Sequence, residues 1–127
     1  MKDLLQMMLD TQKDSQEVRG YDFGMMNTAE TVQYIKSHAL YMTVELGEFL
    51  QELPMFKDWK KYPSGMPVDN DKAREELIDV FHFMLNIFVA MDMSADDIFS
   101  EYMNKHNENA RRLADTQHYK RDTEAHE

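Results

Sequence analysis

The sequence predicts an all-α fold, and three observations support that prediction. Apolar residues recur at intervals near 3.6 residues over most of the chain, and no stretch alternates cleanly with period two. Only four glycines and three prolines interrupt the 127 residues, which leaves long segments without helix breakers. Hydrophobic residues make up 43% of the chain, which is enough for the core of one globular domain. We therefore expect a bundle of four to five helices.

Capping residues and helix breakers divide the chain into four predicted helices. The first covers residues 2–19 and ends before a glycine. The second covers residues 28–53, with a threonine that can cap its start and a proline that closes it. The third covers residues 70–91, after aspartate and asparagine residues that can cap it. The fourth covers residues 94–113, and its first residues, SADD, resemble a capping box.

Two other segments are expected to lie outside these helices. Residues 55–70 include the run FKDWKKYPSGMP and are predicted to form a loop with room for one short helix. Residues 116–127 form a polar tail, which we expect to be frayed and to lie outside a single domain at residues 1–115.

Charge and the absence of cysteine limit the partners and the compartment. The formal net charge of -10 repels nucleic acid and anionic membranes, so we expect neither as a partner. The chain has no cysteine, which excludes disulfides and thiolate metal sites. The N-terminal run MKDLLQMMLDTQKD is broken by charge and resembles neither a signal peptide nor a membrane span. We therefore expect a cytoplasmic protein, whose acids could hold cations.

Two apolar patterns predict where the core lies. Residues 77–91 of the third helix are apolar almost all round, which is typical of a helix buried on all sides. On the second helix, a core stripe is predicted at helical spacing: Ile35, Ala39, Met42, Leu46, Phe49 and Leu53. A second stripe beside it carries Tyr41, Glu45, Glu48 and Glu52.

Acids occur in pairs on both of these helices. Glu45 and Glu48 lie three residues apart in VELGEF, and Glu76 and Asp79 repeat that spacing in EELIDVFHFML. Residues three apart share a helix face. Unpaired buried carboxylates cost several kcal/mol each, so protonation, a basic partner or a cation must compensate them. No basic residue lies in either stripe. Two facing pairs of carboxylates would make a good Mg²⁺ site, with Mn²⁺ as the other candidate.

With these motifs the sequence resembles the all-α nucleoside triphosphate pyrophosphatases, which include MazG and the dimeric all-α dUTPases. Their signature is ExxE followed by ExxD on two antiparallel helices, and here it reads Glu45-Leu-Gly-Glu48 and Glu76-Leu-Ile-Asp79. The closer resemblance is to the dimeric dUTPase branch, which phages often encode. It rests on ELGEFLQELPMFKDWK, EELIDVFHFML and KHNENARR, in that order. It covers residues 4–112.

The resemblance implies an enzyme that converts a nucleoside triphosphate and water to the monophosphate and pyrophosphate. The four acids would be both the metal ligands and the catalytic residues. The resemblance favours dUTP as the substrate, with dCTP or a modified nucleotide as the alternative. Four helices in one short chain leave apolar surface around the third helix that a partner could cover, so we expect a homodimer or a dimer of dimers. The residues expected to bind substrate are Gln12, Lys57, Trp59, Lys60, Asn86, Lys105, Asn109 and Arg112.

Several alternatives remain open from the sequence. Trp59 could stack on a base or anchor its loop, and Lys60 could contact phosphate or be solvated. Asn86 could read a pyrimidine edge or bond to a neighbouring helix. The chain could also be a non-catalytic helical bundle in which the acids bind a structural metal. A di-iron carboxylate bundle fits less well, because such sites pair glutamate with Glu-x-x-His, and neither acid pair has a histidine at its fourth position.

Overall fold

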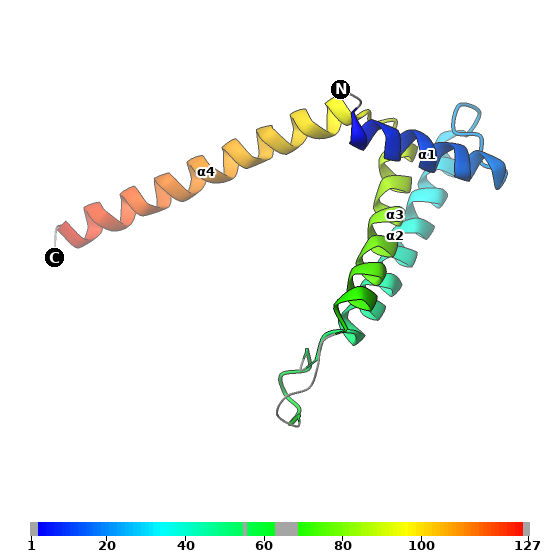
Figure 1. Ribbon diagram of the computed structural model, residues 1–127. Helices are drawn as coiled ribbons and strands as arrows, with labels where there is room; N and C mark the ends of the chain where they lie inside the picture. Colours follow the sequence, from blue (N-terminus) through cyan, green and yellow to red (C-terminus); the bar gives the residue numbers. More distant parts are fainter. Residues whose placement is uncertain (1–2, 55, 63–68, 126–127) are drawn as a thin grey trace. The chain divides into compact units, whose positions relative to one another are not determined.

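The computed structural model describes residues 3–54, 56–62 and 69–125, and side chains as far as residue 117. These residues form helices and no strand, which confirms the all-α prediction. The chain divides into two compact units, Met1–Asp92 and Met93–Glu127. The helices are α1 (Leu4–Val18), α2 (Thr28–Gln51), α3 (Asn70–Ala90) and α4 (Ala95–Ala125) (Figure 1).

The first three helices begin and end within two residues of the predicted positions, because local capping determines their ends. Asp3 caps α1 by accepting from the backbone N–H of Gln6 at 3.2 Å. Gly20 follows α1 with φ 103°, a left-handed conformation that glycine adopts without strain. Asp69 caps α3 by accepting from the backbone N–H of Lys72 at 3.0 Å.

The cap of α2 differs from the prediction. Asn27, not Thr28, is the N-cap, and it forms a capping box with Glu30. The Asn27 side chain accepts from the Glu30 N–H at 2.9 Å, while the Glu30 carboxylate accepts from the Asn27 N–H at 3.2 Å. An asparagine three residues before a glutamate satisfies two backbone donors at once, whereas a threonine one position later has no such partner.

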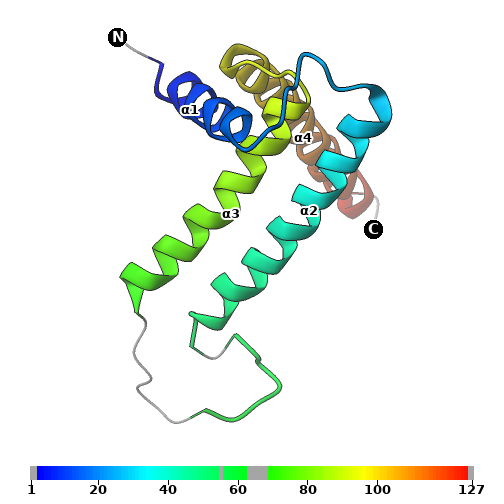
Figure 2. The ribbon, with the colours of Figure 1, turned by 90° about the vertical axis from the view of Figure 1, so that its right-hand side faces the viewer.

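The first unit is a helical hairpin with α1 packed on it. α2 and α3 run antiparallel and side by side, and α1 packs against α3 (Figures 1 and 2). The buried apolar side chains of this unit come from all three helices: Leu9, Tyr34, Ala73, Val80 and Leu85. Within residues 56–62, the described part of the connection between α2 and α3, there is no helix.

The prediction that α3 is buried on all sides is wrong for this chain. Leu77, Ile78 and Met84 are exposed, Ile78 with 51% of its surface. Within the first unit only α1 and α2 pack against α3, and two helices cannot surround a third. The predicted core stripe of α2 is also only half-buried, and its Leu46 is exposed. The fully buried residues of α2 are Tyr34 and His38, which lie closer to the stripe that carries the acids.

The second unit is α4, which extends further than predicted. The capping box at its start is confirmed: Ser94 Oγ accepts from the Asp97 N–H at 3.1 Å, and Asp97 accepts from the Ser94 N–H at 2.9 Å. The helix continues to Ala125 instead of ending near Leu113, because no glycine or proline follows Ser94 to stop it. Among the described helices, none is by itself long and apolar enough to cross a membrane, although α3 and part of α4 would pass that test as a bent pair.

Candidate active site

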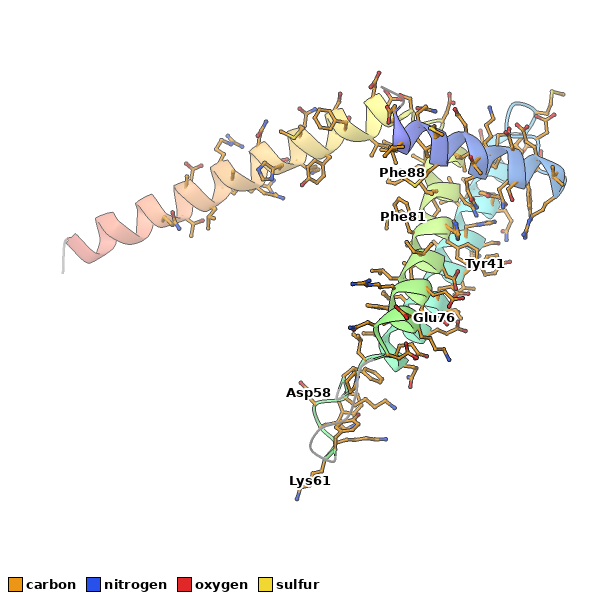
Figure 3. All side chains as sticks on the ribbon, in the orientation of Figure 1. Tyr41, Asp58, Lys61, Glu76, Phe81 and Phe88 are labelled. Carbon is orange, nitrogen blue, oxygen red and sulfur yellow. The ribbon has the colours of Figure 1, made fainter. Side chains whose placement is uncertain are left out.

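Three of the four predicted acids converge between α2 and α3. Glu45 comes from α2, and Glu76 and Asp79 come from α3. One carboxylate oxygen from each residue lies within 4.8 Å of the other two. All three side chains are half-buried, and Figure 3 labels Glu76 on α3, on the side of the hairpin where Tyr41 of α2 also lies. The antiparallel hairpin therefore brings together acids that are more than thirty residues apart in the sequence.

This acid cluster, Glu45, Glu76 and Asp79, is electrostatically uncompensated. Glu45 Oε2 and Glu76 Oε2 are buried and have no hydrogen-bond partner among the described residues. Burial, a hydrogen bond with Glu48 and the charges of Glu48, Asp79 and Glu76 all raise the pKa of Glu45. Burial and then the charges of Glu48 and Asp79 raise the pKa of Glu76, which Lys72 opposes only weakly. A cation bound here would satisfy the two oxygens and neutralise the repulsion.

Glu48 lies beside the cluster rather than in it. Its side chain is exposed and close enough to Glu45 to raise the pKa of that residue. It is not one of the three residues whose oxygens converge. Its position beside the cluster suits a group that could contribute a further ligand to a bound cation, or contact a water molecule next to it.

The cluster fits a small divalent cation that prefers oxygen. Mg²⁺ binds octahedrally at about 2.0–2.1 Å, so two opposite ligand oxygens are about 4.2 Å apart. Only one pair of three such ligands can be opposite, and neighbouring ligands are about 2.9 Å apart. The three oxygens lie within 4.8 Å of one another, so binding would draw them closer together, by up to about 2 Å for a neighbouring pair. Mg²⁺ and Mn²⁺ favour such carboxylate ligands.

A cavity of about 410 Å³ opens next to the acid cluster. This size is within the range typical of small-molecule sites. It connects the acids with two residues predicted to contact the base, Gln12 and Asn86, and with the ring of Phe83. A neighbouring cavity of about 610 Å³ shares several lining residues with it: Gln16, Arg19, Glu45, Phe83 and Asn86.

The inner part of these cavities combines amides with aromatic rings. Asn86 is 2% exposed; its Nδ2 lies 3.1 Å from His38 Nδ1, and its Oδ1 is buried without a partner among the described residues. Gln16 is also buried, and its Oε1 accepts from the Tyr34 hydroxyl at 3.0 Å. The ring of Phe83 lies near that of His38, with centroids 5.6 Å apart. Such walls suit a flat, polar-edged ligand such as a nucleobase.

Comparison with known proteins agrees with this geometry. A family model described as dUTPase matches residues 4–95, which include α1, α2 and α3 with both acid pairs. The chain belongs to the dUTPase family. It is therefore an all-α nucleoside triphosphate pyrophosphatase, a hydrolase that acts on nucleoside triphosphates.

The relatives of this dUTPase family member are phage proteins. A "dCTP pyrophosphatase" of Enterobacteria phage LZ5 is 30% identical over an alignment 135 residues long, gaps included. The alignment covers 84% of this chain and 78% of the relative. A "dCTP pyrophosphatase" of Enterobacteria phage T4 is 32% identical, with 84% and 79% covered. A T4 "DNA replication protein" is 31% identical over 83% of this chain and 34% of its own length. No solved structure matches the chain.

Three predicted substrate-binding residues lie in the loop after α2. Asp58 and Lys61, labelled in Figure 3, mark this loop beyond the end of α2. Trp59 is 75% exposed. Lys60 is also exposed, and Lys57 Nζ lies 5.4 Å from the centroid of the Phe56 ring. The structure therefore places Lys57, Trp59 and Lys60 at the connection between the two acid-bearing helices, and none of them lines the cavities described above.

The other three predicted residues lie on α4, in the second unit. Lys105 and Arg112 share one face of the helix, because both pair with Glu108. The Lys105 Nζ lies 3.6 Å from the Glu108 carboxylate. Asn109, adjacent to Glu108, is exposed. Both cations remain largely exposed in these pairs, so contact with a more strongly charged group such as a phosphate would cost little.

Sequence reasoning missed several residues that line or support the cavities, among them Gln16, Arg19, Tyr34 and His38. Gln16 lies one helical turn after Gln12, and His38 lies two turns before Glu45, so helical spacing could have indicated both. Arg19, the C-cap of α1, brings a positive charge to a site that is otherwise acidic. No sequence signal identified it.

Proposed function

We propose that the chain is a Mg²⁺-dependent pyrophosphatase that hydrolyses dUTP to dUMP and pyrophosphate in the cytoplasm. The observation that carries the proposal is the acid cluster, with its two unsatisfied oxygens, next to a cavity lined by Gln12 and Asn86. dCTP is the second candidate, because two of the relatives are named dCTP pyrophosphatases. The family description favours dUTP.

In this proposal the acids hold the metal and position water. Glu45, Glu76 and Asp79 would hold Mg²⁺, which would bind the phosphates and lower the pKa of a bound water. Glu48 is exposed and lies beside Glu45, so as a carboxylate it could complete the metal site or accept the proton of the attacking water. Attack at the α-phosphorus then releases pyrophosphate.

The remaining phosphate charge requires cations beyond the metal. Arg19 lines the cavity in the first unit. We propose that Lys57 and Lys60 of the loop, and Lys105, Asn109 and Arg112 of α4, contact the phosphates in the assembled enzyme. Charge-assisted contacts of this kind stabilise the charge that develops during phosphoryl transfer.

We further propose that the chain works as a homodimer or a dimer of dimers. The support is the apolar surface that a single copy exposes on α2 and α3, including Leu46, Leu77 and Ile78. Monomeric proteins rarely leave large apolar surface of this kind uncovered, and symmetric self-association is the commonest way to bury it. Neither nucleic acid nor a membrane is a proposed partner.

Base selection is proposed to depend on amide groups and aromatic rings. Gln12 and Asn86 would hydrogen-bond the base edge and Phe83 would stack on it. Trp59 is exposed in the loop beyond the end of α2 and lines neither cavity, so within one chain Phe83 is the proposed stacking partner. A wrong base would leave buried polar groups unpaired, which is the strongest form of discrimination such a site can make.

One assay tests the proposal. The four natural dNTPs and dUTP are incubated with the protein and Mg²⁺, and pyrophosphate and orthophosphate are measured separately. We expect pyrophosphate first, with dUTP or dCTP exceeding dATP and dGTP by at least about a hundredfold in kcat/KM. No turnover of any nucleotide would support the non-catalytic bundle instead. Orthophosphate as the first product would place the attack at the terminal phosphate and contradict the proposal.

A further inference from the structure

Asn86 and His38 form an isolated polar pair at the inner end of the cavity. His38 is 5% exposed and Asn86 2%. The Asn86 Nδ2 and His38 Nδ1 atoms are 3.1 Å apart, which is hydrogen-bond distance. The other Asn86 atom, Oδ1, is buried and lacks a partner among the described residues. One polar atom of the Asn86 amide is therefore left without a hydrogen-bond partner among the described residues, on a residue that lines the cavity.

This pair can form its hydrogen bond in two arrangements, which differ in the tautomer of His38. A neutral imidazole carries its proton on one ring nitrogen only. With the proton on Nε2, Nδ1 accepts a hydrogen bond from the Asn86 amide NH₂, and Oδ1 faces the ligand as an acceptor. With the proton on Nδ1, the ring donates to Oδ1, the amide turns by about 180°, and NH₂ faces the ligand as a donor. The two arrangements occupy almost the same volume.

Uracil and cytosine also differ by an exchange of hydrogen-bond donor and acceptor, at positions 3 and 4 of the ring. Cytosine carries an amino donor at position 4, where uracil carries a carbonyl acceptor. At position 3, uracil has an N–H donor and cytosine a bare nitrogen acceptor. An amide fixed in one orientation would therefore match one base and oppose the other, whereas an amide that can turn matches both.

We propose that His38 is a positioning residue whose tautomer determines the orientation of Asn86, so that one pocket accepts both dUTP and dCTP. This inference rests on the proposed function, which leaves those two substrates in contention. His38 acts through Asn86 and does not itself touch the base.

The surroundings of His38 favour such a role. Burial, followed by the charge of Arg19, lowers the pKa of His38 and keeps the ring neutral, the only state with two tautomers. The ring is held by stacking on Tyr34 at a centroid distance of 3.9 Å. Tyr21 and Tyr41 lie edge-on to it, and the Tyr34 hydroxyl is occupied by Gln16. Aromatic faces fix the plane of the ring without fixing which nitrogen carries the proton.

Nitrogen-15 NMR of the histidine side chains tests the tautomer directly. The full chain is saturated with Mg²⁺ and α,β-imido-dUTP, and a second sample with α,β-imido-dCTP, at mildly alkaline pH. The spectrum of His38→Gln assigns the His38 signals by their absence. We expect opposite tautomers of His38 in the two complexes. The same tautomer in both would overturn the inference.

Kinetics of two substitutions separate positioning from packing. His38→Gln replaces the ring with an amide that can also donate or accept, and should keep kcat/KM for both nucleotides within about fivefold. His38→Phe preserves the aromatic stack but cannot bond Asn86, and should lose about tenfold on both, mainly through KM. A purely structural role predicts the reverse order, since Phe suits the aromatic cluster better than Gln. Phe23→Leu is the control in the same aromatic cluster, because Phe23 lies edge-on to Tyr34 and lines neither cavity; it should leave the ratio of dUTP to dCTP turnover within about twofold.

The outcomes distinguish this inference from the function on which it rests. If the wild-type protein hydrolyses one of the two nucleotides and rejects the other, the inference that one pocket accepts both is overturned. The proposed pyrophosphatase activity is then unaffected. The same holds if His38→Phe outperforms His38→Gln. Wild-type protein that binds and hydrolyses neither dUTP nor dCTP would overturn both.

Discussion

Replacing Glu76 by glutamine should abolish the stabilisation of the protein by Mg²⁺. Glu76 contributes one of the three converging oxygens, and its Oε2 has no partner among the described residues. Glu75 offers a matched control, because it is the adjacent residue on α3, is exposed, and is absent from the cluster. Glu75→Gln and Glu76→Gln remove the same charge, but from faces of the helix about 100° apart.

The size of the effect follows from mass action. A metal present at a hundredfold its Kd stabilises the folded state by about 2.7 kcal/mol. For a domain of this size, about 1 kcal/mol corresponds to about 4 °C in Tm, so Mg²⁺ should raise the wild-type Tm by about 10 °C. Outer-shell partners of metals alone contribute about ten- to hundredfold in affinity, so a lost ligand should cost at least about a hundredfold. At the same Mg²⁺ concentration the Glu76→Gln variant would then gain only about 0.4 kcal/mol, or less than about 2 °C.

Without metal, the order of melting temperatures should be reversed, with Glu76→Gln above wild type. The folded-state pKa values of Glu45 and Glu76 are raised above the ordinary 4.5. The stability that this contributes is therefore fully present below pH 4.5 and is lost as the pH rises through the raised values. At neutral pH, where the carboxylates repel one another, Glu76→Gln should melt above wild type without metal.

Differential scanning fluorimetry with and without Mg²⁺, at constant ionic strength, measures both effects. Glu75→Gln should retain the wild-type response to Mg²⁺, and circular dichroism should show equal helix content in all three proteins. A full Mg²⁺-dependent rise in the Tm of Glu76→Gln would refute the assignment of the cluster as a metal site. An equal loss in Glu75→Gln would attribute the effect to general charge instead.

Three further predictions concern the substrate and pH. Arg112→Ala should lower kcat/KM by about ten- to hundredfold while leaving the Mg²⁺-dependent rise in Tm unchanged; unaltered hydrolysis would exclude Arg112 from phosphate binding. Asn86→Leu should reduce the preference for pyrimidine over purine triphosphates more than it reduces Mg²⁺ affinity, as measured by nucleotide competition and calorimetry, and an unchanged preference would remove Asn86 from the base site. Because the pKa of His38 is lowered from 6.5, its contribution to stability should be complete above pH 6.5 and be lost as the pH falls below it. Urea unfolding against pH should show this dependence in wild type and not in His38→Phe.

Most of the fold could be predicted because the signals are local. Helix caps and breakers lie within a few residues of each helix end, and they place the limits of α1, α2 and α3 to within two residues. The last helix differs from the prediction: its polar composition predicts a frayed tail, but no glycine or proline stops the helix before Ala125. Burial is not local. The exposure of Leu77 and Ile78 depends on which helices pack against α3. The hydrophobic periodicity of α3 alone does not show how many helices these are.

The acid cluster could be predicted in composition but not in detail. Spacing places Glu45 and Glu48 on one face of their helix, but the rotation of α2 against α3 decides which oxygens converge. In the structure Glu45 converges with both acids of α3, and Glu48 lies beside the group. Such a rotation depends on side-chain packing along the whole hairpin. No single motif encodes it.

The pairing of His38 with Asn86, by contrast, was already implied by the acid motifs. In an antiparallel pair of helices, equal steps in opposite directions from one contact lead to the next contact on the same faces. Glu45 faces Asp79. Four residues before Glu45 and four after Asp79 are Tyr41 and Phe83, whose ring centroids are 5.7 Å apart. Seven residues before and seven after are His38 and Asn86, which are hydrogen-bonded. The two acid motifs therefore mark the register of the hairpin, and that register places the residues we assign to base recognition two turns from the acid cluster. A substitution that shifted α2 along α3 by one turn would separate His38 from Asn86 and Glu45 from Asp79 together, so the metal and base sites should be lost as one.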